Sequence, residues 1–339
     1  MKIETDRLEF VELKPEDYKE IASIAREMAW NDTINMLLDD GQQEGLKNFN
    51  PELAKYRETI VKQANDVSLN LYNKKYDDLS DEEKRNIQLC KKISKEIIPE
   101  KNWHINFSQI GPDFEKSAQD FVNGAIGRAK YEPRNGFWLG IKNKKDGKLI
   151  GATTISAKAL QKDGEEIIGH SGQFIAPEYQ RLGYISETKA VMVDFLYKYS
   201  ARQSPPLFSD KAKFYTTCHA LNKGSQALQR KSGAISDGKV YEGGKLHFFA
   251  NKEDILNSGL MHPKKNDINW SVTLDNGMQF GNIIKMSDDA VMHIENVKDK
   301  KKRLKVITVP SDMLKKRKKA NNVEINRLTK LNFKDSIRI

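Results

Sequence analysis

The sequence has only two cysteines, Cys90 and Cys218, which lie far apart in a chain of 339 residues. Neither belongs to a closely spaced cysteine and histidine group of the kind that binds metals, so no metal site is predicted. Two isolated cysteines are typical of free thiols in a reducing compartment. No apolar run approaches the roughly 18 residues that cross a bilayer, and the first residues lack the apolar segment of a signal peptide. These absences predict a cytoplasmic protein without a membrane segment.

The apolar content of the chain is sufficient for a packed core. Hydrophobic residues make up 38% of the sequence. A chain of this length exceeds one ordinary domain, so two or three structural units are expected. No internal repeat stands out.

The net charge of +10 belongs to the C-terminal part of the chain. Residues 264–339 carry 18 Lys and Arg against 9 Asp and Glu, whereas the remainder carries 39 against 38. This segregation suggests a basic module with an acidic partner. Lys300 to Arg303 and Lys315 to Lys319 could contact nucleic-acid phosphates, dock an acidic protein, or form a solvated face without a partner. Few aromatic residues interleave with these runs, so base-specific recognition is not predicted.

The N-terminal part alternates between a strand-like and a helical pattern. Residues 1–30 predict a strand and a helix that begins at Pro15, with acidic residues in its first turn. Residues 31–100 are polar and helical, and they include the capping-box pattern Ser80 to Glu83. We interpret this segment as an inserted helical lobe, which either shapes a substrate groove or is only decorative.

Helices and strands alternate through the middle of the chain. A helix is predicted at 113–130. Strands are predicted at 137–142, 149–156, 166–175 and 213–219, with a closing hairpin at 239–250. This order favours an α/β (α+β) fold with a mixed sheet flanked by helices.

The C-terminal part has a different pattern. Alternating segments at 268–274, 278–285, 290–297 and 304–309 predict strands, and Asp275 to Gly277 predicts a hairpin turn. This run resembles the Sm-like and SH3-like small β-barrels over 264–310, and a terminal helix is predicted after it. The interpretation is a basic barrel domain at 264–339.

The segment His170 to Gly233 is the most informative. A strand closed by Pro177 is followed by Gln180-Arg-Leu-Gly-Tyr-Ile and an amphipathic helix. A helix that begins there aims unpaired amides outward, and Gly183 allows a phosphate group to approach the backbone. About forty residues later, Asn222 to Ser225 predicts a capped helix that ends near Gly233.

Together these motifs resemble the acetyl-CoA-dependent GNAT N-acetyltransferases of the RimJ/RimL-like branch. The resemblance covers about residues 1–30 and 101–255, including the opening Asp6 to Asp17 and the central segments at 137–154. It implies a transferase domain at 1–30 and 101–258. It also implies acetyl-CoA as co-substrate and an amine, of a protein in our interpretation, as acceptor. The cofactor-binding residues that it implies are Phe174, Ile175, Gln180, Arg181, Leu182, Gly183, Tyr184, Ile185 and Asn222.

The resemblance also implies two candidate catalytic residues. Ser225 occupies the family position whose hydroxyl assists the departing thiolate, although it could instead only cap its helix. His170 lies where relatives often carry a carboxylate, and an imidazole that titrates near neutrality could deprotonate the amine. By strand alternation His170 should share a face with Gly172 and Phe174, but a hydrogen-bonded structural histidine is the alternative.

One departure from the family pattern supports a second hypothesis. The family usually has a small Gly or Ala where this chain has Ile185, whose side chain could crowd a pyrophosphate. The alternative function is therefore a catalytically degenerate binding or structural protein on the same fold. It would act through its basic C-terminal domain on nucleic acid or a macromolecular assembly.

Overall fold

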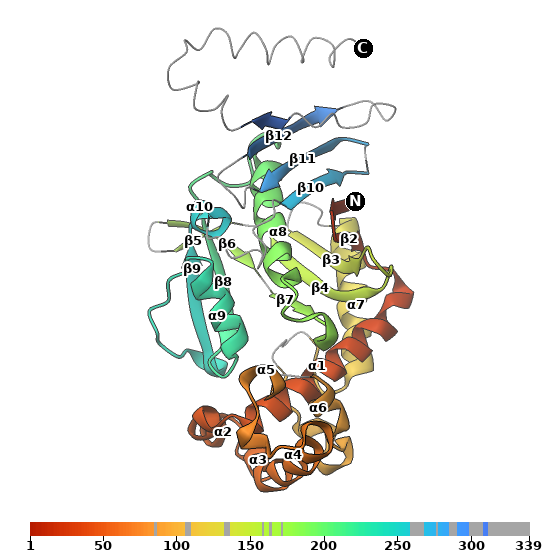
Figure 1. Cartoon of the computed structure of the whole chain (residues 1–339). Coiled ribbons are helices and arrows are strands. Elements are labelled where there is room, and N and C mark those ends of the chain that lie inside the picture. Colours follow the sequence, from red (N-terminus) through yellow and green to blue (C-terminus); the bar gives the residue numbers. More distant parts are fainter. Residues whose placement is uncertain are drawn as a thin grey trace.

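The computed structural model describes most of the chain as two sheets with helices on both sides (Figure 1). The described residues are 1–84, 87–105, 110–131, 136–157, 159–162, 165–170, 172–257, 268–275, 277–284, 290–297 and 308–310. The larger sheet has the order β13 (Thr308–Pro310), β12 (Ala290–Val297), β11 (Gln279–Ile284), β10 (Ile268–Thr273), β1 (Lys2–Thr5), β2 (Leu8–Glu12), β3 (Gly136–Asn143), β4 (Leu149–Ser156) and β7 (Gly172–Ile175). The smaller sheet has the order β5 (Ala159–Lys162), β6 (Glu165–His170), β8 (Lys213–His219) and β9 (Lys245–Ala250).

Long helices cover both faces of the larger sheet. The helices α1 (Tyr18–Leu38) and α7 (Phe114–Tyr131) pack on one face, where their apolar stripes share a core with Phe174. The helix α8 (Tyr184–Ala201) packs on the other face, in a core shared with both sheets. Figure 1 shows α8 rising through the centre of the molecule between the two sheets.

Short helices form a lobe at the lower end of the molecule in Figure 1. They are α2 (Gln43–Phe49), α3 (Pro51–Ala54), α4 (Arg57–Tyr72), α5 (Asp81–Lys84) and α6 (Ile87–Lys92). The capping box that the sequence predicts is confirmed, since the Glu83 amide donates to Ser80 Oγ (3.2 Å) and the Ser80 amide to Glu83 Oε2 (2.7 Å). The predicted boundary at residue 31 lies inside α1, because Ile34 and Leu37 continue its buried stripe.

The strands of the middle part agree closely with prediction at β3, β4 and β8. The segment predicted as one strand at 166–175 is two strands, β6 and β7, which pair in different sheets. His170 therefore does not belong to the same strand as Gly172 and Phe174. The predicted hairpin at 239–250 is reduced to a bridge between Tyr241 and Lys245, and β9 pairs with β8 instead.

The C-terminal strands extend the larger sheet. The turn after β10 forms the predicted hairpin, with Gly277 at a φ of +79° and its amide donating to the Leu274 carbonyl (2.8 Å). β10 also pairs antiparallel with β1, so it continues the sheet beyond the N-terminal strand. A closed barrel is not shown by the described strands. The predicted terminal helix and the basic runs Lys300 to Arg303 and Lys315 to Lys319 lie outside the described residues.

In the part of the chain that the structure describes, no helix combines the length and the apolar character needed to cross a membrane. Among these same residues, no group of three or more His, Cys, Asp or Glu side chains is arranged to hold a metal ion.

Candidate functional site

The two sheets part where β6 gives way to β7. β6 pairs with β8 in parallel up to His170 opposite Thr216. After residue 171 the chain joins the other sheet, where β7 pairs with β4. The last residues of β8 and the whole of β7 are therefore not paired with each other. This splay leaves the facing edges of β7 and of the end of β8 without strand partners among the described residues.

The loop after β7 leads into a helix start that is not capped by a side chain. Arg181 and Gly183 both have left-handed backbone angles, with φ of +63° and +82°. Gly183 is the N-cap of α8, and as glycine it has no side chain that could cap the amides of the first turn. A long helix that begins with uncapped amides after such a loop suits a phosphate group.

Side chains on the loop fix its shape. Gln180 Nε2 donates to the Ile175 carbonyl (3.3 Å), which ties the loop back to β7. The Tyr179 hydroxyl donates to Asp146 Oδ2 (2.6 Å), and this hydrogen bond raises the pKa of Tyr179 to about 12. Arg181 and Leu182 are exposed. Ile185 is half-buried and packs against the α8 core.

Gln173 carries the polar side chain of β7. Its position alternates with that of Phe174, so it lies on the face of β7 that α8 covers. Both polar atoms of the Gln173 amide are buried, and neither has a hydrogen-bond partner among the described residues. The hydroxyls of Thr153 and Thr188 are in the same condition. Because orphaned polar atoms are costly, Gln173 is suited to a ligand that carries its own amide groups.

The second candidate motif lies at the start of α9 (Lys223–Lys231). Asn222 is confirmed as its cap, since Asn222 Oδ1 accepts from the Ser225 amide (2.9 Å). The Ser225 side chain is half-buried and makes a hydrogen bond with the Cys218 thiol at the end of β8. Burial raises the pKa of Cys218 more than this hydrogen bond lowers it. Ser225 thus lies beside the end of β8.

Two histidines from distant segments meet at the end of β8. The rings of His104 and His219 lie edge to face with centroids 5.2 Å apart. His219 Nδ1 accepts from the Leu221 amide (3.1 Å), which leaves its proton on Nε2. Burial, followed by the neighbouring charges of His104 and Lys245, lowers the pKa of His219 to about 4. A neutral imidazole whose Nδ1 is engaged is a poor base. The side chain of His170 lies outside the described side chains.

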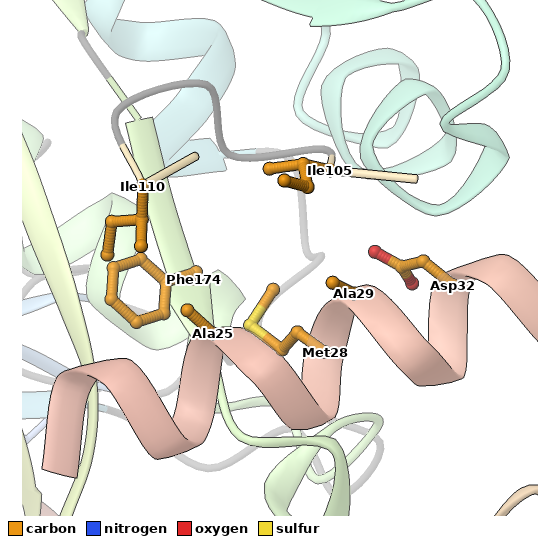
Figure 2. A pocket seen from close by; sticks show the side chains of 7 residues that line it. All are labelled: Ala25, Met28, Ala29, Asp32, Ile105, Ile110 and Phe174. Carbon is orange, nitrogen blue, oxygen red and sulfur yellow. The ribbon is translucent and has the colours of Figure 1, made fainter. Parts of the chain in front are cut away.

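A pocket opens on the opposite face of β7, against α1 (Figure 2). Its lining is apolar except for one carboxylate and consists of Ala25, Met28, Ala29, Asp32, Ile105, Ile110 and Phe174. Figure 2 shows Asp32 at one end of this pocket and Phe174 at the other. β7 therefore has Gln173 on one face and an apolar pocket on the other. The sequence patterns identified neither Gln173 nor Asp32, because a lone polar residue in a strand or helix is unremarkable.

The family model of the acetyltransferase (GNAT) domain matches residues 100–235. This part of the chain is a GNAT acetyltransferase domain. The match agrees with the resemblance of the motifs in this part of the chain, and domains of this family use acetyl-CoA. The match includes the splayed strands, the loop before α8 and the start of α9.

No curated protein matches the chain. Among solved structures, a GnaT-family acetyltransferase from Bordetella pertussis is 10% identical, covering 74% of this chain and 97% of its own, with a TM-score of 0.37. The ribosomal-protein-S5-alanine acetyltransferase from Vibrio fischeri is 16% identical over 41% of this chain and 73% of its own, with a TM-score of 0.31. The microcin C7 self-immunity acetyltransferase MccE, solved with acetyl-CoA and AMP, is 11% identical over 73% and 93%, with a TM-score of 0.34. These similarities are too low to add to the family match.

Proposed function

We propose that this protein transfers the acetyl group of acetyl-CoA to an amine, with a protein amine as the acceptor. The observation that carries the proposal is the pair of unsatisfied features on the α8 side of β7. These are the uncapped amides at Gly183 and the orphaned amide of Gln173. The first fits a pyrophosphate and the second fits the amide-containing arm of the same molecule.

The chain's own residues supply binding, orientation and proton transfer. The first-turn amides of α8 and the guanidinium of Arg181 would hold the negatively charged end of acetyl-CoA. Acetyl-CoA supplies an acetyl thioester that an uncharged amine can attack. The Ile175 amide, which points away from β4, would polarise the thioester carbonyl. Ser225 would donate a proton to the departing sulfur and regain one from the nitrogen of the attacking amine as the new amide forms. Positioning of the two substrates on opposite faces of β7 would give the largest contribution.

The acceptor would approach from the α1 face. The pocket there has apolar walls, the Asp32 carboxylate and a volume of about 10 Å³, so it suits an ammonium group and no larger part of the acceptor. Ile105 and Ile110, from the segment that follows the lobe, close this pocket against α1. Ile185 supports the enzyme over the degenerate alternative, because its side chain packs toward the core.

Calorimetric titration of the full-length chain with acetyl-CoA, at low and high salt, tests the cofactor half of the proposal. We expect saturable one-to-one binding at both salt concentrations. Salt weakens electrostatic contacts in a partly buried site less than it weakens nonspecific binding of an anion to the basic C-terminal runs. Absence of binding at both would overturn the proposal. Release of the CoA thiol can then be followed with peptides that have a free amino terminus. The same peptides with blocked amines serve as the control.

A further inference from the structure

A single arginine from the N-terminal strands reaches the loop that precedes α8. Arg7 lies in the turn between β1 and β2. Its Nη1 donates to the carbonyl of Leu182 (2.9 Å), and its guanidinium lies over the Tyr184 ring, 4.5 Å from the centroid. Its Nε donates to Glu187 Oε2 (2.7 Å), and Nη2 contacts the same oxygen. One side chain thus holds three positions of the loop and the first turn.

We propose that Arg7 is a positioning residue that holds the loop before α8 in the shape that binds acetyl-CoA. This inference rests on the proposed function and adds a residue outside the matched domain, since the family model covers residues 100–235. Arg7 acts through the loop and is not itself assigned a contact with the cofactor.

The hydrogen bond from Arg7 to the Leu182 carbonyl sets the direction of the Gly183 amide. In a planar trans peptide the carbonyl and the following N–H point in opposite directions. Because Arg7 draws the Leu182 carbonyl toward itself, the Gly183 N–H is turned away from Arg7. A left-handed angle is uncommon for a residue with a side chain such as Arg181, so contacts from outside the loop help to hold this conformation.

The carboxylate of Glu187 lies close to the same helix start. Glu187 lies in the first turn of α8, and its side chain is only 3% exposed. An uncompensated carboxylate there would repel an anion bound at the helix start. Arg7 neutralises this charge, and Thr5 fixes its position, since Thr5 Oγ1 donates to Glu187 Oε1 (2.5 Å) and accepts from the Leu8 amide (2.8 Å).

The test must separate positioning from stability, because removal of Arg7 alone would leave a buried carboxylate unpaired. The double variant R7M/E187M removes both charges and keeps similar volume, so the fold is retained. A matched control is R26M/E100M. Arg26 Nε donates to Glu100 Oε1 (2.6 Å), and the Arg26 guanidinium carbon lies 5.5 Å from the Phe114 ring centroid, so this pair has the same chemistry without a contact to Leu182, Tyr184 or Glu187.

We expect the R7M/E187M variant to melt near the wild-type temperature and its Kd for acetyl-CoA to rise about tenfold or more, as for loss of a charge-assisted hydrogen bond. The control variant should bind like the wild type. Retention of affinity in R7M/E187M would show that Arg7 does not position the loop for acetyl-CoA and would overturn the inference. If the wild type itself fails to bind acetyl-CoA, the proposed function and this inference both fall.

The single variant R7K gives an independent decision should the double variant not fold. Lysine keeps a positive charge beside Glu187. Its single ammonium group lacks the planar fork with which the arginine guanidinium donates to Glu187 and to the Leu182 carbonyl at the same time. We expect a Kd for acetyl-CoA raised several-fold with an unchanged melting temperature. An unchanged Kd would overturn the inference.

Discussion

Lys223, in the first turn of α9, donates to Asp39 at the end of α1, with Nζ and Oδ2 2.6 Å apart. This contact joins the lobe to the helix that carries Ser225. Leu221, immediately before that helix, is buried in the core cluster of the lobe. The lobe therefore packs against the edge of the domain where Ser225 lies, which favours a role in shaping the acceptor groove over a decorative one.

Substitution of Gly183 by alanine should weaken acetyl-CoA binding by at least about tenfold. A side chain at its left-handed φ of +82° strains the loop, and its Cβ would crowd the anion site. Gly238 provides a matched control, because it has a φ of +74° and no atom lies within 4 Å of the place that a Cβ would occupy there. Both variants should lose about 1 kcal/mol of stability, whereas only G183A should lose affinity. Equal affinities in calorimetry would contradict the assignment.

Substitution of Gln173 by leucine should have opposite effects on stability and binding. Removal of two orphaned polar atoms should stabilise the ligand-free protein by about 1 kcal/mol. It should also weaken acetyl-CoA binding, because the partner for the ligand's amides is lost. The control is T153V, at a fully buried hydroxyl on β4 that lies opposite Gln173 and is also orphaned among the described residues. T153V should stabilise without a change in affinity, and a Q173L variant with normal affinity would show that Gln173 faces no ligand.

Substitution of Ser225 by alanine should lower kcat by about 100-fold, the effect of a lost general acid. The Kd for acetyl-CoA should remain unchanged, because the Ser225 amide and its cap at Asn222 are retained. S225T keeps a hydroxyl and should recover most of the rate. Steady-state kinetics that show equal kcat for S225A and the wild type would leave Ser225 with only its place in the first turn of α9.

The strands could be predicted from sequence wherever alternation alone defines them. β8 has the predicted bounds because its buried and half-buried positions alternate without interruption. The division of β6 from β7 could not be predicted, since it depends on which neighbour each half pairs with. The same holds for β10, whose pattern predicts a strand but not that β1 is its partner.

The candidate site likewise contains residues that the sequence predicts and residues that it does not. The loop from Gln180 to Gly183 and the cap at Asn222 are local patterns, and a single sequence is enough to predict both. The contacts between Arg7 and Glu187 join residues 180 positions apart, and no pattern within one sequence encodes such a pair. The isolation of Gln173 likewise depends on what surrounds it in space.

Substitution of Trp270 should destabilise the whole transferase core, because β10 is part of it. The Trp270 indole is 1% exposed, and its Nε1 donates to Asp194 Oδ2 on α8 (2.9 Å). W270F should lose about 1–3 kcal/mol of unfolding free energy, because the buried Asp194 carboxylate loses this hydrogen-bond donor. W138F, at a half-buried tryptophan of β3, should lose less than about 1 kcal/mol. Similar losses in urea denaturation would mean that β10 adds little to the core.

The buried amine of Lys189 should make stability depend on pH above neutrality. Lys189 is 3% exposed on α8, and its Nζ donates to Gln229 Oε1 and Ser232 Oγ, both at 2.5 Å. Burial lowers its pKa to about 7 in the folded protein, from 10.5. Between these values the unfolded chain binds more protons than the folded chain, so the free energy of unfolding contributed by this group rises with pH.

The variant K189M removes this contribution. Its stability relative to the wild type should therefore be most favourable below pH 7, where the wild type buries a charged amine, and should fall steadily toward pH 10. Urea denaturation at pH 6 to 10 measures this difference. The exposed Lys231 on α9 provides the control, since K231M should differ from the wild type by a constant amount across the range. A difference between K189M and the wild type that is equally independent of pH would show that burial does not lower the pKa of Lys189.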